Sequence, residues 1–330
     1  MTLALTVMLV HALASPAHAA QWLRLRSPHF VVVGDASEGV LRQVAQRVEG
    51  FRRGLIRALP QATVAMPVPM TIVVFATDAG FTPFKPLVRG QPMERVAGYF
   101  VAGEDANFIG MTVAHGEAAY PVILHEYTHA LLAETLPDLP LWLNEGLAEV
   151  YSTYTERADG RSAMVGAAPA HHIRELQSGA PLAIEELMRA DATSTLYNEG
   201  DRRGAFYARA WALSHYLLLG NQARRAQLPE YLRLLATGMP VPEALRQAFQ
   251  CDPRTLDNEL REYTRLFSLN GMSVTLDPSM RRVAMSSEPI AAAEATAYTA
   301  ELLARLGRTN EAERALSTVL RTQPGQPRTL

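Results

Sequence analysis

The pattern of hydrophobic and polar positions changes character about a third of the way along the chain. Before residue 117, apolar runs rich in β-branched residues predict strands at 29–33, 70–76, 95–101 and 107–112. Between the first two runs, apolar residues recur at steps of three and four from 38 to 59, which predicts an amphipathic helix. These elements together indicate a small α/β lobe.

Helical periodicity dominates from residue 117 onward. It predicts helices at 118–134, 141–154, 171–178, 183–190, 203–219, 228–236, 241–249, 253–267, 291–306 and 309–322. We therefore expect an α+β fold in several parts. These are an N-terminal α/β lobe (21–116), a mainly helical lobe (117–269), a linker (270–290) and a C-terminal helical hairpin (291–330).

The last two predicted helices have the spacing of one tetratricopeptide unit, although an ordinary helical hairpin would show the same pattern. A single unit of this kind cannot bury its own apolar face. It must therefore pack on the body of the protein, on another chain or on further repeats. The tail is thus a candidate surface for a protein partner.

The N-terminus has the pattern of a secretory signal peptide. Residues 3–14 are almost wholly apolar, and Ala17-His18-Ala19 follows as a small-residue cleavage pattern. The apolar run is too short to span a bilayer as a stable helix. We expect residues 1–20 to be removed and the protein to be secreted or periplasmic, with an uncleaved N-terminal anchor as the alternative. No other segment has the length of a membrane span.

Charge and cysteine content exclude several kinds of site. With 31 basic and 33 acidic residues, the formal net charge is −2, and no run of Lys or Arg marks a nucleic-acid surface. Cys251 is the one cysteine, so neither an intramolecular disulfide nor a cysteine-based zinc cluster can form.

The candidate chemistry begins with His125-Glu126-Tyr127-Thr128-His129, which lies inside an apolar helical segment. Residues i and i+4 share one face of a helix, so both imidazoles can reach one metal ion. Glu126 stands beside the first ligand, in a position to hold the water that zinc polarises. This HExxH motif predicts a zinc site with Glu126 as general base.

A catalytic zinc site needs a third protein ligand and an open position for water. Glu145 is the candidate, because it lies 16 residues after His129 on the next predicted helix. Pro137 and Pro140 separate the two helices and allow the second to return alongside the first. Two neutral ligands and one carboxylate would leave the ion a net positive charge that lowers the pKa of its water.

With these residues the chain resembles the gluzincin metallopeptidases, the superfamily of thermolysin and aminopeptidase N. The resemblance rests on the HExxH motif and on W-L-N-E-G at 142–146. It implies that Glu145 is the third zinc ligand. It also implies that Glu149, one helical turn later, orients a ligand histidine.

The chain departs from the aminopeptidases in two respects. The gap between His129 and Glu145 is shorter than theirs. The G-x-M-E-N segment, which recognises the free amine of the substrate in the aminopeptidases, is absent before the zinc motif. Residues 27–267 look more like the small bacterial "peptidase MA-like" branch. The resemblance therefore favours an endopeptidase acting on a protein or peptide, with an edge strand at 95–101 or 107–112 binding the substrate.

Gluzincins usually add a Tyr or His that stabilises the oxyanion. Tyr207 is the best candidate, with Tyr151, Tyr154 and Tyr197 as alternatives. The competing interpretation is that Tyr207 belongs to one packed helical stripe with Trp211 and His215.

The other histidines have simpler interpretations. His215 is expected to be a core or edge histidine, and His171 and His172 are expected at the surface, since adjacent helical residues do not share a face.

Two alternatives to zinc-dependent peptide hydrolysis remain. One is a non-catalytic cell-envelope scaffold that binds its partner through the helical tail. The other is a purely structural zinc site, which is disfavoured because such sites are closed by four protein ligands and the motif offers three.

Overall fold

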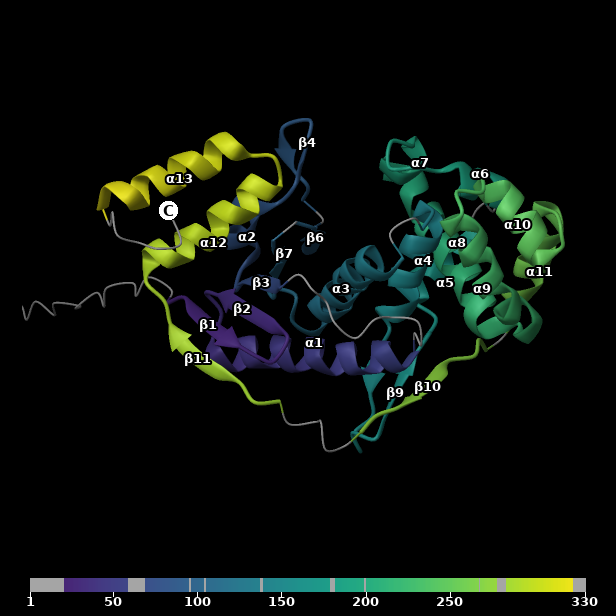
Figure 1. The fold of residues 1–330 in the computed structure, drawn as a ribbon, viewed down its shortest axis with the longest axis horizontal. Coiled ribbons are helices and arrows are strands. Elements are labelled where there is room, and N and C mark those ends of the chain that lie inside the picture. The colour runs from purple at the N-terminus through teal and green to yellow at the C-terminus, as the bar shows by residue number, and fades with distance from the viewer. Residues whose placement is uncertain are drawn as a thin grey trace, which may run out of the picture.

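The computed structural model describes residues 21–58, 69–94, 96–103, 105–136, 139–178, 182–198, 200–266, 268–277 and 283–322. The predicted signal peptide lies outside these residues. Within them the predicted α+β architecture is confirmed: a sheet forms from the N-terminal part and most of the remainder is helical (Figure 1). No helix in the described part of the chain has the length and apolar composition needed to cross a bilayer.

A six-stranded sheet forms the N-terminal lobe. Its strand order is β11-β1-β2-β3-β7-β6. The bounds are β1 (Leu23–Arg26), β2 (Phe30–Gly34), β3 (Met70–Phe75), β6 (Gly98–Val101), β7 (Asn107–Thr112) and β11 (Ser286–Pro289). Strands β2, β3 and β7 run parallel, and β6 pairs antiparallel with β7. Consequently β7 is an inner strand and β6 is the edge.

Both faces of this sheet are covered, and alternate residues of each strand point to opposite faces. Val32, Ile72 and Val74 belong to the core cluster that includes α1 (Glu38–Ala58) and α3 (Ala119–Thr135). Their neighbours Val33 and Val73 pack instead in the cluster that contains α12 (Ala292–Arg305). Burial on both faces explains why these strands appear in the sequence as continuous apolar runs.

The helical lobe follows α3 and surrounds a second buried helix, α4 (Leu141–Tyr151). Its other helices are α5 (Ala170–Ser178), α6 (Ile184–Arg189), α7 (Thr195–Asn198), α8 (Gly200–His215), α9 (Gln222–Ala236), α10 (Val241–Phe249) and α11 (Pro253–Tyr263). A π-helical turn, η3 (Tyr216–Gly220), continues α8. A tight turn near Gly160 joins β8 (Thr155–Glu156) to β9 (Ser162–Val165).

Shorter elements lie between the strands of the large sheet and before α3. These are α2 (Asp78–Phe81), η1 (Thr82–Phe84), β4 (Leu87–Val88), β5 (Gln91–Pro92) and η2 (Gly116–Ala118). The sequence pattern did not predict them, because each is too short to show a period.

A glycine sets the distance between α4 and α8. A Cβ on Gly146 would lie 2.3 Å from the Ala210 carbonyl oxygen and 2.2 Å from the Ser214 hydroxyl oxygen. Position 146 therefore has no room for a methyl group, so only glycine permits this approach of the two helices. The W-L-N-E-G segment therefore combines the packing requirement of Gly146 with the chemistry of the residue before it.

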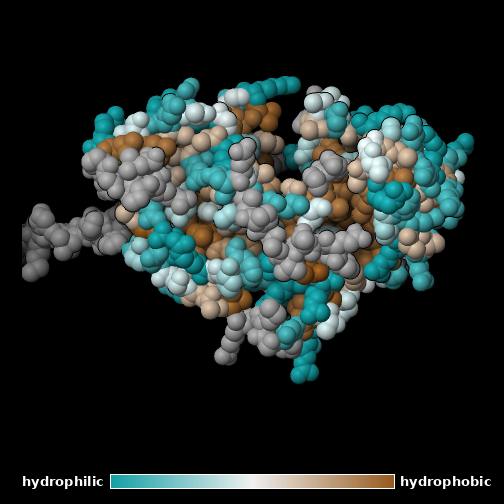
Figure 2. All heavy atoms as spheres, in the orientation of Figure 1, coloured by the Kyte–Doolittle hydropathy of each residue, from teal (hydrophilic) through white to brown (hydrophobic). Residues whose placement is uncertain are grey.

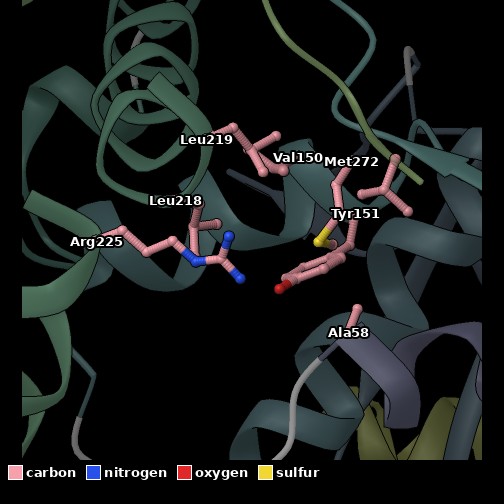
Figure 3. Close-up of a pocket in the computed structure, with 8 residues that line it drawn as sticks. Ala58, Val150, Tyr151, Leu218, Leu219, Arg225 and Met272 are labelled. Carbon is pink, nitrogen blue, oxygen red and sulfur yellow. The ribbon is translucent and has the colours of Figure 1, made fainter. Parts of the chain in front are cut away.

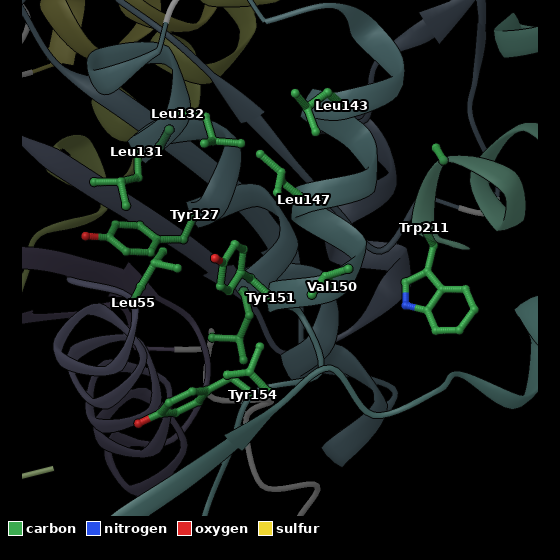
Figure 4. Packing of buried hydrophobic residues seen from close by; sticks show 14 of the residues in the cluster. Leu55, Tyr127, Leu131, Leu132, Leu143, Leu147, Val150, Tyr151, Tyr154 and Trp211 are labelled. Carbon is green, nitrogen blue, oxygen red and sulfur yellow. The ribbon is translucent and has the colours of Figure 1, made fainter. Parts of the chain in front are cut away.

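The buried faces of α3 and α4 meet over α1. Figure 4 shows Tyr127, Leu131, Leu147 and Tyr151 gathered with Leu55 of α1 in this layer. The Tyr127 ring is fully buried, with its centroid 5.9 Å from that of Phe51. The histidines of the HExxH motif therefore lie on the opposite side of α3.

A small cavity of about 20 Å³ lies at the end of this layer, between α4, η3 and β10 (Met272–Thr275) (Figure 3). The Tyr151 side chain and the Arg225 guanidinium approach it from different sides. A cavity of this size has room for about one water molecule. It is a packing feature rather than a substrate site.

The segment predicted as a linker contributes one strand to the six-stranded sheet and one to a three-stranded sheet of order β10-β9-β8. Strand β10 pairs with β9, and β11 pairs with β1 through the register Leu23↔Pro289. The linker prediction for residues 270–290 is therefore wrong for these two stretches. Their patterns, M-S-V-T and S-S-E-P, carry too little apolar alternation to indicate strands without their distant partners.

Of the two C-terminal helices, α12 packs on the body of the protein, and α13 (Thr309–Thr322) packs on α12. Tyr298 and Leu302 of α12 are buried against the sheet. Arg305 bonds Asp105 at 2.7 Å, and Arg308 donates to the Pro83 carbonyl at 2.6 Å. Of the three ways for the hairpin to bury its apolar face, the structure uses the body of the same chain.

Candidate metal centre

Helix α3 brings the two histidines of the HExxH motif together. His125 and His129 are one turn apart, and their Nε2 atoms are 3.0 Å from each other. Each keeps about 15% of its side chain exposed, so the pair opens to solvent. Figure 2 shows a hollow at the upper edge of the molecular surface. It lies between the part that carries β4 and the part that carries α7 in Figure 1.

Helix α4 adds the carboxylate that the sequence nominated as third ligand. Glu145 Oε2 lies 3.3 Å from His125 Nε2 and 3.4 Å from His129 Nε2. Ligand atoms about 2.0–2.1 Å from a tetrahedral zinc ion are separated by about 3.3 Å. The three atoms therefore form a triangle of the size that one face of a zinc tetrahedron requires.

The Glu145 carboxylate has an oxygen that the protein itself does not satisfy. Glu145 is 4% exposed, and its Oε2 is buried without a hydrogen-bond partner among the described residues. A buried carboxylate oxygen without a partner costs free energy unless a cation or a donor compensates it. The site thus has both the donor set and the unmet demand of a metal centre.

A partner at the Nδ1 atom of each histidine turns both Nε2 atoms toward the centre of this triangle. His129 Nδ1 lies 3.0 Å from Asn144 Oδ1, and His125 Nδ1 lies 3.4 Å from Glu149 Oε1. With a proton on each Nδ1, each Nε2 lone pair is free for a metal. Glu149 thus lies beside His125, one of the two candidate ligand histidines. Asn144 was not singled out, although its place beside Glu145 was a usable signal.

A buried histidine supports Glu149 from behind. His172 Nε2 lies 2.8 Å from Glu149 Oε2, and His172 is 3% exposed. The expectation that His172 lies at the surface is therefore wrong, whereas His171 is exposed. Helix α5 packs on α8 and turns His172 inward, where its ring stacks on Trp211 with centroids 5.7 Å apart. Only the packing of distant helices reveals this contact.

Two tyrosines flank the ligands on the other side. Tyr197 of α7 donates its hydroxyl to Glu145 Oε1 at 2.9 Å. Tyr207 of α8 stacks on Tyr197 with centroids 6.1 Å apart, and its ring centroid lies 6.5 Å from that of His125. Burial, followed by the Glu145 charge, raises the pKa of both phenols, so both remain protonated donors at neutral pH.

The remaining candidates lie elsewhere. Tyr151 is buried in the layer between α1 and α4, and the Tyr154 hydroxyl donates to the Gly50 carbonyl at 2.9 Å. His215 is a core histidine, as expected, with ring nitrogens 2.8 Å from the Tyr263 hydroxyl and from the Gly166 carbonyl oxygen. These side chains serve packing, which leaves Tyr207 and Tyr197 beside the metal centre.

Glu126 connects the metal centre with the edge of the sheet. Its Oε2 accepts the backbone N–H of Phe100 in β6 at 2.9 Å. Burial raises the pKa of Glu126 above its ordinary value, and the neighbouring histidines oppose that rise. A raised pKa brings a carboxylate nearer to the range in which it can both accept and return a proton.

Without a metal ion, the carboxylates hold a proton on the first histidine. Burial disfavours the imidazolium, but the nearby Glu145 carboxylate and the charges of Glu126 and Glu149 raise the pKa of His125 to about 9. Burial also disfavours the charged form of Glu145, yet the two histidines hold the pKa of this carboxylate well below the usual range. A metal ion would have to displace the His125 proton.

The comparisons with known proteins place the centre inside a shared region. A family model described as "Protein of unknown function (DUF1570)" matches residues 111–242, which include His125, His129, Glu145, Tyr197 and Tyr207. No curated protein matches the chain.

The raised pKa of His125 predicts how the stability of the metal-free protein depends on pH. The stabilisation by protonated His125 is fully present below the pKa of an unfolded histidine, near 6.5. It is lost as pH rises through about 9. The free energy of unfolding of chelator-treated protein should therefore fall by roughly 1–3 kcal/mol over this interval. Urea unfolding at pH 6.5 and 9.5 measures the change.

The control for this measurement is His125→Gln, which should flatten the dependence in the same interval. A metal-free protein whose stability is constant or increases between these pH values would contradict the assignment of the proton to His125.

Proposed function

We propose that this protein is a zinc-dependent metallopeptidase of the gluzincin type that cleaves peptide bonds within a protein or peptide substrate. The observation that carries the proposal is the triangle of His125, His129 and Glu145 ligand atoms, with edges of 3.0–3.4 Å. The carboxylate of Glu126, which is suited to proton transfer, lies beside the triangle and accepts a hydrogen bond from the edge strand of the sheet. We also propose that the protein works outside the cytoplasm, from the signal-peptide pattern.

His125, His129 and Glu145 would hold the ion, with Asn144 and Glu149 fixing the two imidazoles. When bound, zinc supplies Lewis acidity, which lowers the pKa of a water and polarises the substrate carbonyl. Three protein ligands leave one position open, which distinguishes this set from a closed structural site.

Glu126 is the general base. It accepts the proton of the attacking water and passes it to the leaving amine, so that one carboxylate serves both halves of the reaction. The bond from the Phe100 N–H fixes the carboxylate and leaves its second oxygen for the proton transfer. The raised pKa of Glu126 favours the return of the proton.

Strand β6 is the proposed substrate-binding edge. The Thr112 N–H donates to the Ala97 carbonyl at 2.9 Å, which places Ala97 in a hydrogen-bonded pair with β7. In the alternating antiparallel ladder, Gly98 and Phe100 then point their backbone groups away from β7. An extended peptide can add to this edge and lie across the metal centre.

Tyr207 is the proposed donor to the oxyanion. Tyr197 already uses its hydroxyl on Glu145, so it positions a ligand rather than the substrate. Tyr207 stands next to it, with Arg203 over its ring at 5.4 Å. A neutral phenol can donate to the developing negative charge without losing its own proton.

Removal of the third ligand should remove the metal. Purified protein should contain one zinc per chain by elemental analysis, and Glu145→Ala should retain almost none after dialysis. The matched control is Glu134→Ala, an exposed glutamate on α3, which should keep a full complement. A native protein without stoichiometric zinc would remove the basis of the proposal.

Removal of the general base should separate binding from chemistry. Glu126→Gln should keep its zinc but lose about 10²–10⁴-fold in turnover of an unfolded protein substrate such as labelled casein. Glu134→Gln serves as the control for loss of charge on the same helix. If a cellular phenotype or partner binding survives Glu126→Gln unchanged, the scaffold alternative gains support.

The two tyrosines should behave differently. Tyr207→Phe should lower kcat about 10²–10³-fold at unchanged zinc affinity. Tyr197→Phe should instead weaken zinc affinity, about tenfold in a chelator competition, with kcat largely recovered at saturating zinc. The reverse pattern would exchange the two roles.

A further inference from the structure

A groove with a volume of about 800 Å³ lies on the helical lobe, away from the metal centre. It runs between α5 and the C-terminal end of α11, with α8 contributing to its wall. Its lining residues are Ala168, Ile173, Leu176, Gln177, Arg209, Arg261, Thr264, Arg265, Leu266 and Leu269. The volume is in the range of small-molecule sites in proteins.

Arginines concentrate positive charge in this groove. Arg209 is 2% exposed and pairs with Asp257, yet its Nε is buried without a hydrogen-bond partner among the described residues. Arg261 and Arg265 are exposed, and within the described chain neither forms an ion pair. Asp257 offsets one of the three charges, so the groove carries a net positive charge that calls for an anion.

The remaining wall is apolar. Ile173 and Leu176 line the α5 side, while Leu266 and Leu269 line the other. Leu266 is 56% exposed and is the most exposed large hydrophobic residue in the described chain. Exposure of such side chains beside unpaired cations is typical of a surface that binds both a charged and an apolar group.

We propose that this groove binds a single-chain anionic lipid, namely a fatty acid. The carboxylate would lie between Arg261 and Arg265, within reach of Arg209, and the hydrocarbon chain would lie along Ile173, Leu176 and Leu266. A free inorganic anion would leave the apolar wall uncovered.

A peptide fits this groove less well than a lipid. The lining residues come from helices and the segments next to them, and β8, β9 and β10 contribute none. Backbone groups inside helices are already paired, so a peptide backbone buried here would find few partners. A hydrocarbon chain needs no such partners.

The groove is separate from the catalytic residues but shares two helices with them. Helix α5 carries His172 toward Glu149 and Ile173 toward the groove. Helix α8 carries Tyr207 beside His125 and Arg209 in the groove wall. The proposal therefore makes no use of the metal, and its test is independent of the proposed peptidase activity.

The test is titration of the full-length protein, after any signal cleavage, with dodecanoate below its micellar concentration, followed by calorimetry. Saturable binding with a stoichiometry near one is expected. The double variant R261A/R265A should weaken it at least tenfold, with an unchanged circular dichroism spectrum and urea midpoint as evidence of folding. The matched control is Arg254→Ala, an exposed arginine on the same helix that does not line the groove.

Four further ligands decide what the groove recognises. Affinity should increase about two- to fourfold per methylene from octanoate to dodecanoate, and dodecanol should bind at least tenfold more weakly than dodecanoate. Inorganic phosphate alone should not saturate. A flat dependence on chain length, equal binding of dodecanol, insensitivity to R261A/R265A, or tighter binding of an apolar peptide with a free C-terminal carboxylate would overturn the proposal.

Discussion

The arrangement of the molecule depends on holding one carboxylate out of water. Glu145 is 4% exposed, and an ionised carboxylate in such a place costs several kcal/mol unless other groups compensate its charge. The compensation comes from His125 and His129 on α3 and from Tyr197 on α7. Three helices from different stretches of the chain must therefore dock in one relative position, and the proposed cation would compensate the charge that they leave unsatisfied.

That docking requires the helices to approach closely. Gly146 follows Glu145 directly, and its missing side chain allows α8 to lie against α4. The same approach brings Tyr207 near His125. One short segment of α4 thus sets both the charge at the centre and the distance of the helix that carries the proposed oxyanion donor.

The grouping of the candidate ligands was predictable from the sequence where it depends on local spacing. A period of 3.6 residues was enough to place His125 and His129 on one helix face. Glu145 was nominated because a catalytic site needs a third ligand, the next helix can return alongside the first, and the W-L-N-E-G segment resembles the gluzincin motif. The apolar runs of β2, β3 and β7 were equally informative, because burial on both faces leaves no polar alternation.

The features that escaped prediction depend on partners far along the chain. His172 is buried only because α5 packs on α8, and nothing beside it in sequence indicates Glu149 as its partner. Tyr197 was considered for the substrate, but its hydroxyl is committed to a ligand 52 residues earlier. Strand β11 has no apolar alternation of its own and forms because β1 supplies its register.

The pairing of β11 with β1 has a consequence for the order of assembly. Strand β1 is among the first described residues, and its outer partner lies about 260 residues later in the chain. Until that partner has been made, β1 is an edge with unpaired backbone groups, which can capture strands from other molecules. A chain emerging from a ribosome or a translocation channel would complete this sheet only after about 260 further residues had been made. Newly made protein would therefore be expected to depend on a holding chaperone during that interval.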